Sequence, residues 1–200
     1  MQLVLASQSP RRSELLAALG VRFRVETASV SEWEEECADP VALVTHNARI
    51  KGAAVAERHA ALPVLSADTT VSCDGVVLNK PMDAADAVRM LRHLSGRTHD
   101  VFTAVCLTWR LHDVAETIVV RSGVRFRKLD DARIAEYLDK VHTLDKAGGY
   151  AIQEHGELII EGYEGSLSNI IGLPLDEVRE LLARNGVLDQ VTVAADDGNP

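Results

Sequence analysis

Residues 3–20, with the sequence LVLASQSPRRSELLAALG, predict a short strand, a polar turn and a helix in direct succession. Ser9 is a typical N-cap residue, and Pro10 suits the first helical turn because its fixed φ is already helical. The first N–H groups of such a helix have no intrahelical partner, and two arginines follow Pro10 there. The segment therefore predicts a βα unit with an anion site at its turn. A capped helix with solvated arginines fits the same residues.

Size and composition indicate one globular unit. A chain of 200 residues, 46% of them hydrophobic, can bury about 70% of its unfolded surface. We expect a single domain of two lobes over residues 1–188 and a disordered tail over residues 189–200. No apolar run approaches the ~18 residues of a membrane span, and no basic segment precedes the first apolar run. We therefore expect a cytoplasmic protein that does not enter membranes.

The net charge limits the classes of partner that this chain can bind, and the cysteine spacing limits its disulfide and metal chemistry. The net charge of −9 disfavours nucleic acid and anionic lipid, because both require a cationic surface. The three cysteines, Cys37, Cys73 and Cys106, form no CxxC pair, so we expect reduced thiols rather than disulfides or a metal knot.

A second informative stretch covers residues 63–78, PVLSADTTVSCDGVVL. Its apolar start leads to Asp68 and Thr69, and the Asp74–Gly75 pair predicts a hairpin turn. Open α/β sheets place chemistry at strand ends, so Asp68 is a candidate catalytic carboxylate. A purely structural aspartate at a strand end is the alternative.

Common nucleotide and hydrolase motifs are missing, since the chain holds no GxxxxGK[ST], GxGxxG, HExxH or GxSxG. What remains is a set of cations and carboxylates in polar segments: Arg11, Arg12, Lys51, Lys80 and Lys146 with Glu32, Asp68 and Asp145. If these side chains converge, the cations would neutralise a polyphosphate and the carboxylates would hold a divalent ion. Individually, Lys51 could be a solvated helix lysine and Glu32 part of a solvated acidic loop.

Seven segments in this order and spacing resemble the Maf family of nucleoside triphosphate pyrophosphatases over residues 3–184. They are SQSPRR (7–12), NARIKG (47–52), SADTTV (66–71), DGVVLNKP (74–81), LSGRTHDVFT (94–103), DKAGGYAIQ (145–153) and SNIIGLP (168–174). The resemblance implies an α/β protein with a mixed central sheet flanked by helices and a cleft between two lobes, related to inosine triphosphate pyrophosphatase-like folds. It also implies a homodimer that cleaves a nucleoside triphosphate to the monophosphate and pyrophosphate with Mg²⁺ or Mn²⁺.

The same resemblance assigns roles. Asp68 is expected to be the proton acceptor, acting on water made more acidic by a metal that Glu32 and Asp68 bind. The resemblance also implies that six residues hold the triphosphate: Ser7, Ser9, Arg11, Arg12, Lys51 and Lys80.

The substrate specificity is also implied by the resemblance. Three positions, Thr69, Gln153 and again Arg12, match the family branch that acts on dTTP and UTP. The imide edge of uracil and thymine offers one N–H donor beside carbonyl acceptors, and the amide of Gln153 is complementary to it. The expected substrates are therefore dTTP, UTP and related modified pyrimidine triphosphates.

Some positions depart from the family pattern, and they leave the substrate range open. The departures are Asn79, Ala104, Gly149, Ala151, Glu154 and His155. Two other functions stay possible at this point: a nucleotide-binding regulator of cell division, and a phosphomonoesterase that releases phosphate.

Overall fold

A seven-stranded mixed sheet runs through the molecule in this computed structural model, which describes residues 1–34 and 39–192. Cys37 and residues 193–200 lie outside the described residues. The strands are β1 (Leu3–Ala6), β2 (Phe23–Val25), β3 (Val64–Cys73), β4 (Val76–Leu78), β5 (Thr98–Trp109), β6 (Val114–Phe126) and β7 (Ile160–Glu164). Their order is β2-β1-β3-β5-β6-β7, with β4 on β3. Within the described residues, β1 pairs in parallel with β2 and with β3 and the other strand pairs are antiparallel, so the expected mixed α/β sheet is confirmed.

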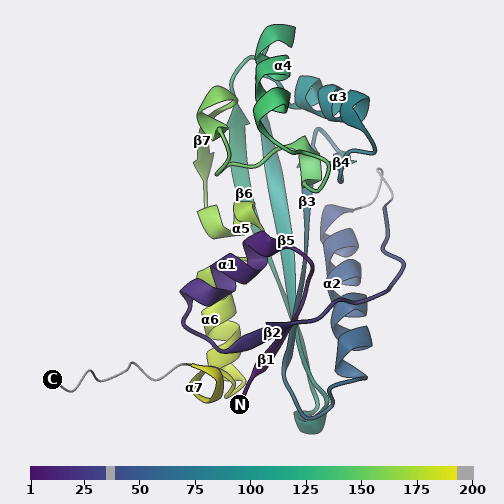
Figure 1. Cartoon of the computed structure of the whole chain (residues 1–200), viewed down its shortest axis with the longest axis vertical. Helices are drawn as coiled ribbons and strands as arrows, with labels where there is room; N and C mark the ends of the chain where they lie inside the picture. Colours follow the sequence, from purple (N-terminus) through teal and green to yellow (C-terminus); the bar gives the residue numbers. More distant parts are fainter. Residues whose placement is uncertain (35–38, 193–200) are drawn as a thin grey trace, which may run out of the picture.

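Helices cover both sides of this sheet and its upper end (Figure 1). They are α1 (Pro10–Ala18), α2 (Pro40–Ala56), α3 (Ala84–Leu94), α4 (Asp131–Lys140), α5 (Leu167–Ile171), α6 (Leu175–Arg184) and α7 (Leu188–Val191). Figure 1 shows α1, α6 and α7 on one side of the lower half of the sheet, α2 on the other side, and α3 and α4 at the upper end. One apolar cluster packs beneath α6 and another beneath α3 and α4. The site lies between these two ends.

The register of β3 leaves a gap on one of its edges. Strand β1 pairs with β3 only up to Ser66, and β4 begins pairing at Val71, whereas β5 pairs with residues 64–72 along the opposite edge. Residues 67–70 therefore have one edge without a strand partner, and their backbone groups are open to side chains. Asp68 and Thr69 lie within this gap.

Close packing of α2 on β3 determines what faces Asp68. The Ser66 hydroxyl donates to the Ala48 carbonyl at 2.7 Å, and a Cβ added at Gly52 would come within 2.6 Å of the Ser66 Oγ atom. Glycine is needed at position 52 because a larger residue would push the helix away from the strand. Asn47 and Lys51 of the same helix then face Asp68.

Two local expectations have clear outcomes. Asp74 and Gly75 both have positive φ, 51° and 80°, as the predicted tight hairpin between β3 and β4 requires. The expectation of a disordered tail from residue 189 is wrong for residues 189–192, because α7 extends to Val191, which is fully buried in the cluster beneath α6. Val187 and Val191 lie one helical turn apart, and burial of both side chains holds this segment against the core although Asp189 and Gln190 are polar.

The two described cysteines, Cys73 and Cys106, are free and buried, as expected for reduced thiols. Within residues 1–34 and 39–192, none of the helices combines the length and the apolar character needed to cross a bilayer.

Candidate active site

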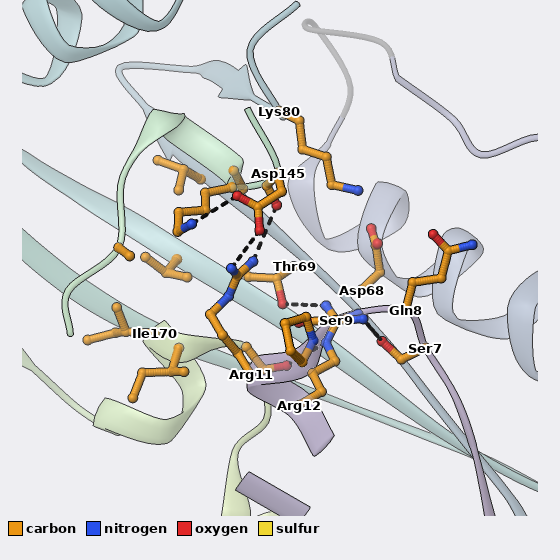
Figure 2. A pocket seen from close by; sticks show the side chains of 18 of the residues that line it. Ser7, Gln8, Ser9, Arg11, Arg12, Asp68, Thr69, Lys80, Asp145 and Ile170 are labelled. Carbon is orange, nitrogen blue, oxygen red and sulfur yellow. Dashed lines mark hydrogen bonds and ion pairs between the residues drawn. The ribbon is translucent and has the colours of Figure 1, made fainter. Parts of the chain in front are cut away.

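A single cavity of about 310 Å³ at the gap in the β3 edge brings the predicted site residues together (Figure 2). Its lining includes all ten: Ser7, Ser9, Arg11, Arg12, Glu32, Lys51, Asp68, Thr69, Lys80 and Gln153. They come from the turn between β1 and α1, from α1, the loop before α2, α2, β3, the loop after β4 and the segment before β7. Segments that are far apart in the sequence therefore form one polar groove.

Neighbouring residues of β3 reach this cavity from opposite faces of the sheet. Side chains alternate along a strand, so Asp68 faces α2 whereas Thr69 faces α1. Lys51 of α2 donates to Asp68, and Arg12 of α1 donates to Thr69. The cavity wraps around the open edge of β3, and it can therefore use both faces.

Asp68 has two polar partners on α2. Lys51 Nζ lies 2.7 Å from Asp68 Oδ1, and Asn47 Nδ2 donates to Asp68 Oδ2 at 3.2 Å. Lys51 also donates to Glu32 Oε2 at 3.0 Å, so its ammonium lies between two carboxylates. Only 11% of the Lys51 side chain and 13% of the Asp68 side chain is exposed, which strengthens these charge interactions. The alternative that Lys51 is only a solvated helix lysine is therefore wrong.

Arg12 connects four segments around the cavity. Its Nε atom donates to Gly172 O at 2.9 Å, and its two terminal nitrogens donate to Ala67 O and Thr69 Oγ1, both at 2.9 Å. A weaker bond of 3.3 Å reaches Ser7 Oγ. Burial lowers the pKa of Arg12, while the negative charge of Asp68 opposes this effect. The planar guanidinium thus covers the open edge of β3 with donors that a lysine cannot supply.

The end of the cavity near α1 is rich in hydrogen-bond donors. Ser9 occupies the N-cap position of α1, as expected, but its side chain makes no capping bond. Ser9 N donates instead to Ser7 Oγ at 3.2 Å. Figure 2 shows the exposed side chain of Lys80 extending into the cavity from the loop after β4. The helix N-terminus and the exposed ammonium of Lys80, which line the same cavity, suit a phosphate group.

Opposite charges also join α1 to the segment before β7. Arg11 donates to Asp145 Oδ2 at 2.8 Å, and Lys146 donates to Asp145 Oδ1 at 2.9 Å (Figure 2). Burial opposes ionisation of Asp145, but the hydrogen bonds from Lys146 and Arg11 outweigh it and lower the pKa to about 2. Glu154, a departure from the family pattern, lies 3.4 Å from Lys146, which is only 6% exposed. Glu154 therefore balances a buried charge beside the cavity.

Part of the lining is apolar, and sequence reasoning did not identify it. Ile152, Ile170, Ile171, Val101 and Tyr150 contribute to this wall. Gln153 is exposed and lines the same cavity, next in sequence to Ile152. These residues lie in the family motifs, but their apolar character alone predicts only packing. The bond from Asn47 to Asp68 was also not predicted, although Asn47 belongs to the NARIKG segment (47–52).

The residues present fit a divalent cation. A single ammonium lies within 3.0 Å of both Glu32 Oε2 and Asp68 Oδ1, so the two carboxylates can approach one positive centre. Carboxylate oxygens are the ligands that Mg²⁺ and Mn²⁺ prefer. A second group of possible ligands in the described residues, Cys73, Asp74 and His93, lies outside the cavity lining. Arg97 donates to Asp74 there at 3.1 Å, which already balances that charge.

A family model and curated relatives both match nearly the whole chain. The model of the family "Maf-like protein" matches residues 2–185. A dTTP/UTP pyrophosphatase of Myxococcus xanthus is 49% identical over 185 residues, covering 92% of this chain and 93% of its own. One from Moorella thermoacetica is 45% identical, covering 93% and 96%.

Among solved structures, a HAM1 protein from Coxiella burnetii aligns with 92% of this chain and 99% of its own, at 18% identity and a TM-score of 0.49. The nucleoside-triphosphatase or dITP/XTP pyrophosphatase of Mycobacterium abscessus aligns with 95% and 98%, at 18% identity and a TM-score of 0.44. Because the family match spans nearly the whole chain and relatives of almost equal length share more than 40% of their residues, the protein belongs to the Maf family.

Proposed function

We propose that this protein hydrolyses dTTP and UTP to the nucleoside monophosphate and pyrophosphate. One observation carries the proposal: Asp68 lies in a cavity with Glu32 on one side and with Arg11, Arg12, Lys51 and Lys80 in the same lining. Relatives covering more than nine-tenths of the chain carry the name dTTP/UTP pyrophosphatase. Carboxylates beside several cations suit phosphoryl chemistry, where positioning and charge neutralisation supply most of the rate.

Asp68 is the proposed proton acceptor. A divalent ion bound by Glu32 and Asp68 would supply a water molecule with a lowered pKa. Asp68 accepts a proton from the attacking water, whose oxygen forms a bond to the α-phosphorus. The bond from the α-phosphorus to the bridging oxygen breaks, and pyrophosphate leaves with that oxygen. Asn47 and Lys51 hold the two carboxylate oxygens of Asp68 in place for this transfer.

The cations and hydroxyls are proposed to hold the triphosphate. Lys80 is exposed and free to turn toward an anion, and the N-terminus of α1 presents N–H groups beside Ser7 and Ser9. Arg11 reaches the same cavity from α1. Arg12 already donates to four protein oxygens, so its main proposed contribution is to orient Thr69 and the loops.

Base recognition is proposed to combine shape with hydrogen bonding. The wall formed by Ile152, Ile170 and Ile171 is suited to the flat face of a pyrimidine. The Gln153 amide offers both an acceptor and a donor to an imide edge, which a carboxylate does not. Specificity then depends on leaving no buried polar group unpaired with the correct base.

The test uses the purified full chain with UTP or dTTP and Mn²⁺ in water enriched in ¹⁸O. We expect pyrophosphate as the product and the label in the monophosphate, because attack occurs at the α-phosphorus. Label in pyrophosphate would place attack at the β-phosphorus, and release of orthophosphate alone would indicate a phosphomonoesterase. Binding without products would favour a regulator, a function that nothing in the described residues or in the relatives' names supports.

The proposal also covers the compartment, the oligomeric state, the domain organisation and the partners of the enzyme. We propose a cytoplasmic homodimer in which each chain is one domain of two lobes and neither nucleic acid nor a membrane is a partner. The net charge of −9 supports the last point. Light scattering on a size-exclusion column would measure the mass, and a monomer mass near 21.7 kDa would contradict the dimer.

A further inference from the structure

Asn47 links the loop that carries Glu32 to the carboxylate of Asp68. Its Nδ2 atom donates to Trp33 O at 3.1 Å and to Asp68 Oδ2 at 3.2 Å, and its Oδ1 atom accepts from Trp33 N at 2.8 Å. Asn47 is only 2% exposed. One buried amide therefore contacts the backbone of the residue after Glu32 and the side chain of Asp68.

The orientation of this amide has one solution. Both N–H groups of Asn47 point at oxygens, and its carbonyl oxygen faces a backbone N–H. Rotation by 180° would place Oδ1 against the Trp33 carbonyl and the Asp68 carboxylate, leaving three groups unpaired. Because buried unpaired groups cost about 1–3 kcal/mol each, the amide is locked between its two partners.

The loop before α2 is attached at two points, first to the turn that follows this helix and then to the helix itself. Near its start, Arg58 donates to Glu26 Oε1 at 2.8 Å and to Thr27 O at 3.1 Å. At its other described end, the Trp33 ring stacks on His46 with centroids 3.7 Å apart and an interplanar angle of 11°. Trp33 is also the residue that Asn47 binds through its backbone. Glu32 thus directly precedes the second attachment point.

The geometry points to Asn47 as a positioning residue that sets the separation of the Glu32 and Asp68 carboxylates, and so the affinity for the divalent ion. The inference rests on the proposed function, because it concerns the same site. Groups that orient metal ligands typically contribute 10–100-fold to affinity. The His46–Trp33 stack supports the same loop more weakly, since it touches the indole ring and not the backbone beside Glu32.

The test replaces Asn47 by Ala in the full chain. We expect the Mn²⁺ concentration for half-maximal UTP hydrolysis to rise about 10–100-fold and kcat to fall, with KM for UTP changed less than threefold. His46→Ala should show a smaller rise of the same kind. In a Glu32→Gln background, Asn47→Ala should raise the Mn²⁺ requirement by a smaller factor than in the wild type, because only the bond from Asn47 to Asp68 is then left to lose.

A second readout needs neither metal nor turnover. The chain has two tryptophans, so Trp109→Phe leaves Trp33 as the reporter. We expect Asn47→Ala to increase quenching of Trp33 fluorescence by iodide, because the loop is released from α2. Thermal unfolding checks that the variants are folded.

The matched control is Asn185→Ala. Asn185 also donates two side-chain hydrogen bonds, to Glu116 at 2.7 Å and Leu181 O at 2.9 Å, but it lies outside the cavity lining. An equal loss in the control, or unchanged Mn²⁺ requirement and quenching in Asn47→Ala, would overturn the inference while the proposed activity stands. An inactive wild-type protein would instead overturn the proposed function, and unchanged quenching would then overturn the positioning role as well.

Discussion

Arg11 donates a hydrogen bond to Asp145 at 2.8 Å although 134 positions separate the two residues in the chain. The contact joins helix α1 to the segment that also carries Lys146 and Gln153. Because the cavity lies between these elements, this ion pair closes one of its sides. Asp145 is titratable, so acid should weaken this contact between α1 and the segment before β7.

Asp145→Asn should reduce stability at neutral pH and have little effect near pH 2. The folded pKa of about 2 lies below the ordinary value of 3.8, so the stabilisation is present above about pH 4 and is lost as pH falls through about 2. With 43% of the Asp145 side chain exposed, solvent screening reduces the effect to about 1 kcal/mol. Urea unfolding at several pH values measures the difference. Asp74→Asn, in an exposed hairpin pair, should show a smaller one.

Arg12→Lys should destabilise the protein and lower kcat/KM together. A lysine cannot reproduce donors directed at Gly172 O, Ala67 O and Thr69 Oγ1, so buried acceptors lose their partners. We expect a loss of about 2–4 kcal/mol in unfolding free energy. Arg49→Lys, at an exposed arginine bonded to Thr117, should change stability by less than about 0.5 kcal/mol. Comparable losses in both variants would refute this role for Arg12.

Asp68→Asn should reduce turnover at least about 100-fold, because the amide cannot accept the proton from water. Its size is nearly unchanged, and Asn47 and Lys51 remain in place, so circular dichroism should match the wild type. Pyrophosphate release measures the activity. A variant with wild-type kcat would rule out Asp68 as the proton acceptor.

Lys80→Ala should raise KM for UTP about tenfold, with a smaller effect at high salt. Lys80 is exposed at the cavity, so its charge contributes to binding the phosphates and little to the fold. Lys140, which pairs with Glu136 at 2.8 Å on α4, offers a control of equal charge. Lys140→Ala should leave KM unchanged at both salt concentrations, and a rise equal to that of Lys80→Ala would point to a general charge effect.

Gln153→Glu should lower kcat/KM for UTP and dTTP about tenfold relative to GTP. Guanine offers two adjacent donors that suit a carboxylate, whereas an imide edge needs both an acceptor and a donor from the protein. Steady-state kinetics with the three nucleotides give the ratio directly. An unchanged ratio would remove Gln153 from base recognition.

Local sequence was sufficient for features in which a few neighbouring residues decide the structure. Pro10 predicts the first turn of α1, and Asp74–Gly75 predicts the hairpin, because backbone preference at one or two positions determines each. The strand, turn and helix of residues 3–20 follow from the same preferences. The ten residues expected at the site all line the cavity, nine of them within the seven family segments and Glu32 outside those segments.

Tertiary structure alone decided how these residues are paired. Lys51 is a typical solvated helix lysine until the packing of Gly52 on Ser66 brings it over Asp68. Likewise, the polar residues after Leu188 indicate a tail, but burial of Val191 forms a helix there. Periodicity along one element describes only that element, whereas burial and charge pairing depend on which segments meet in space, and the sheet register settles that.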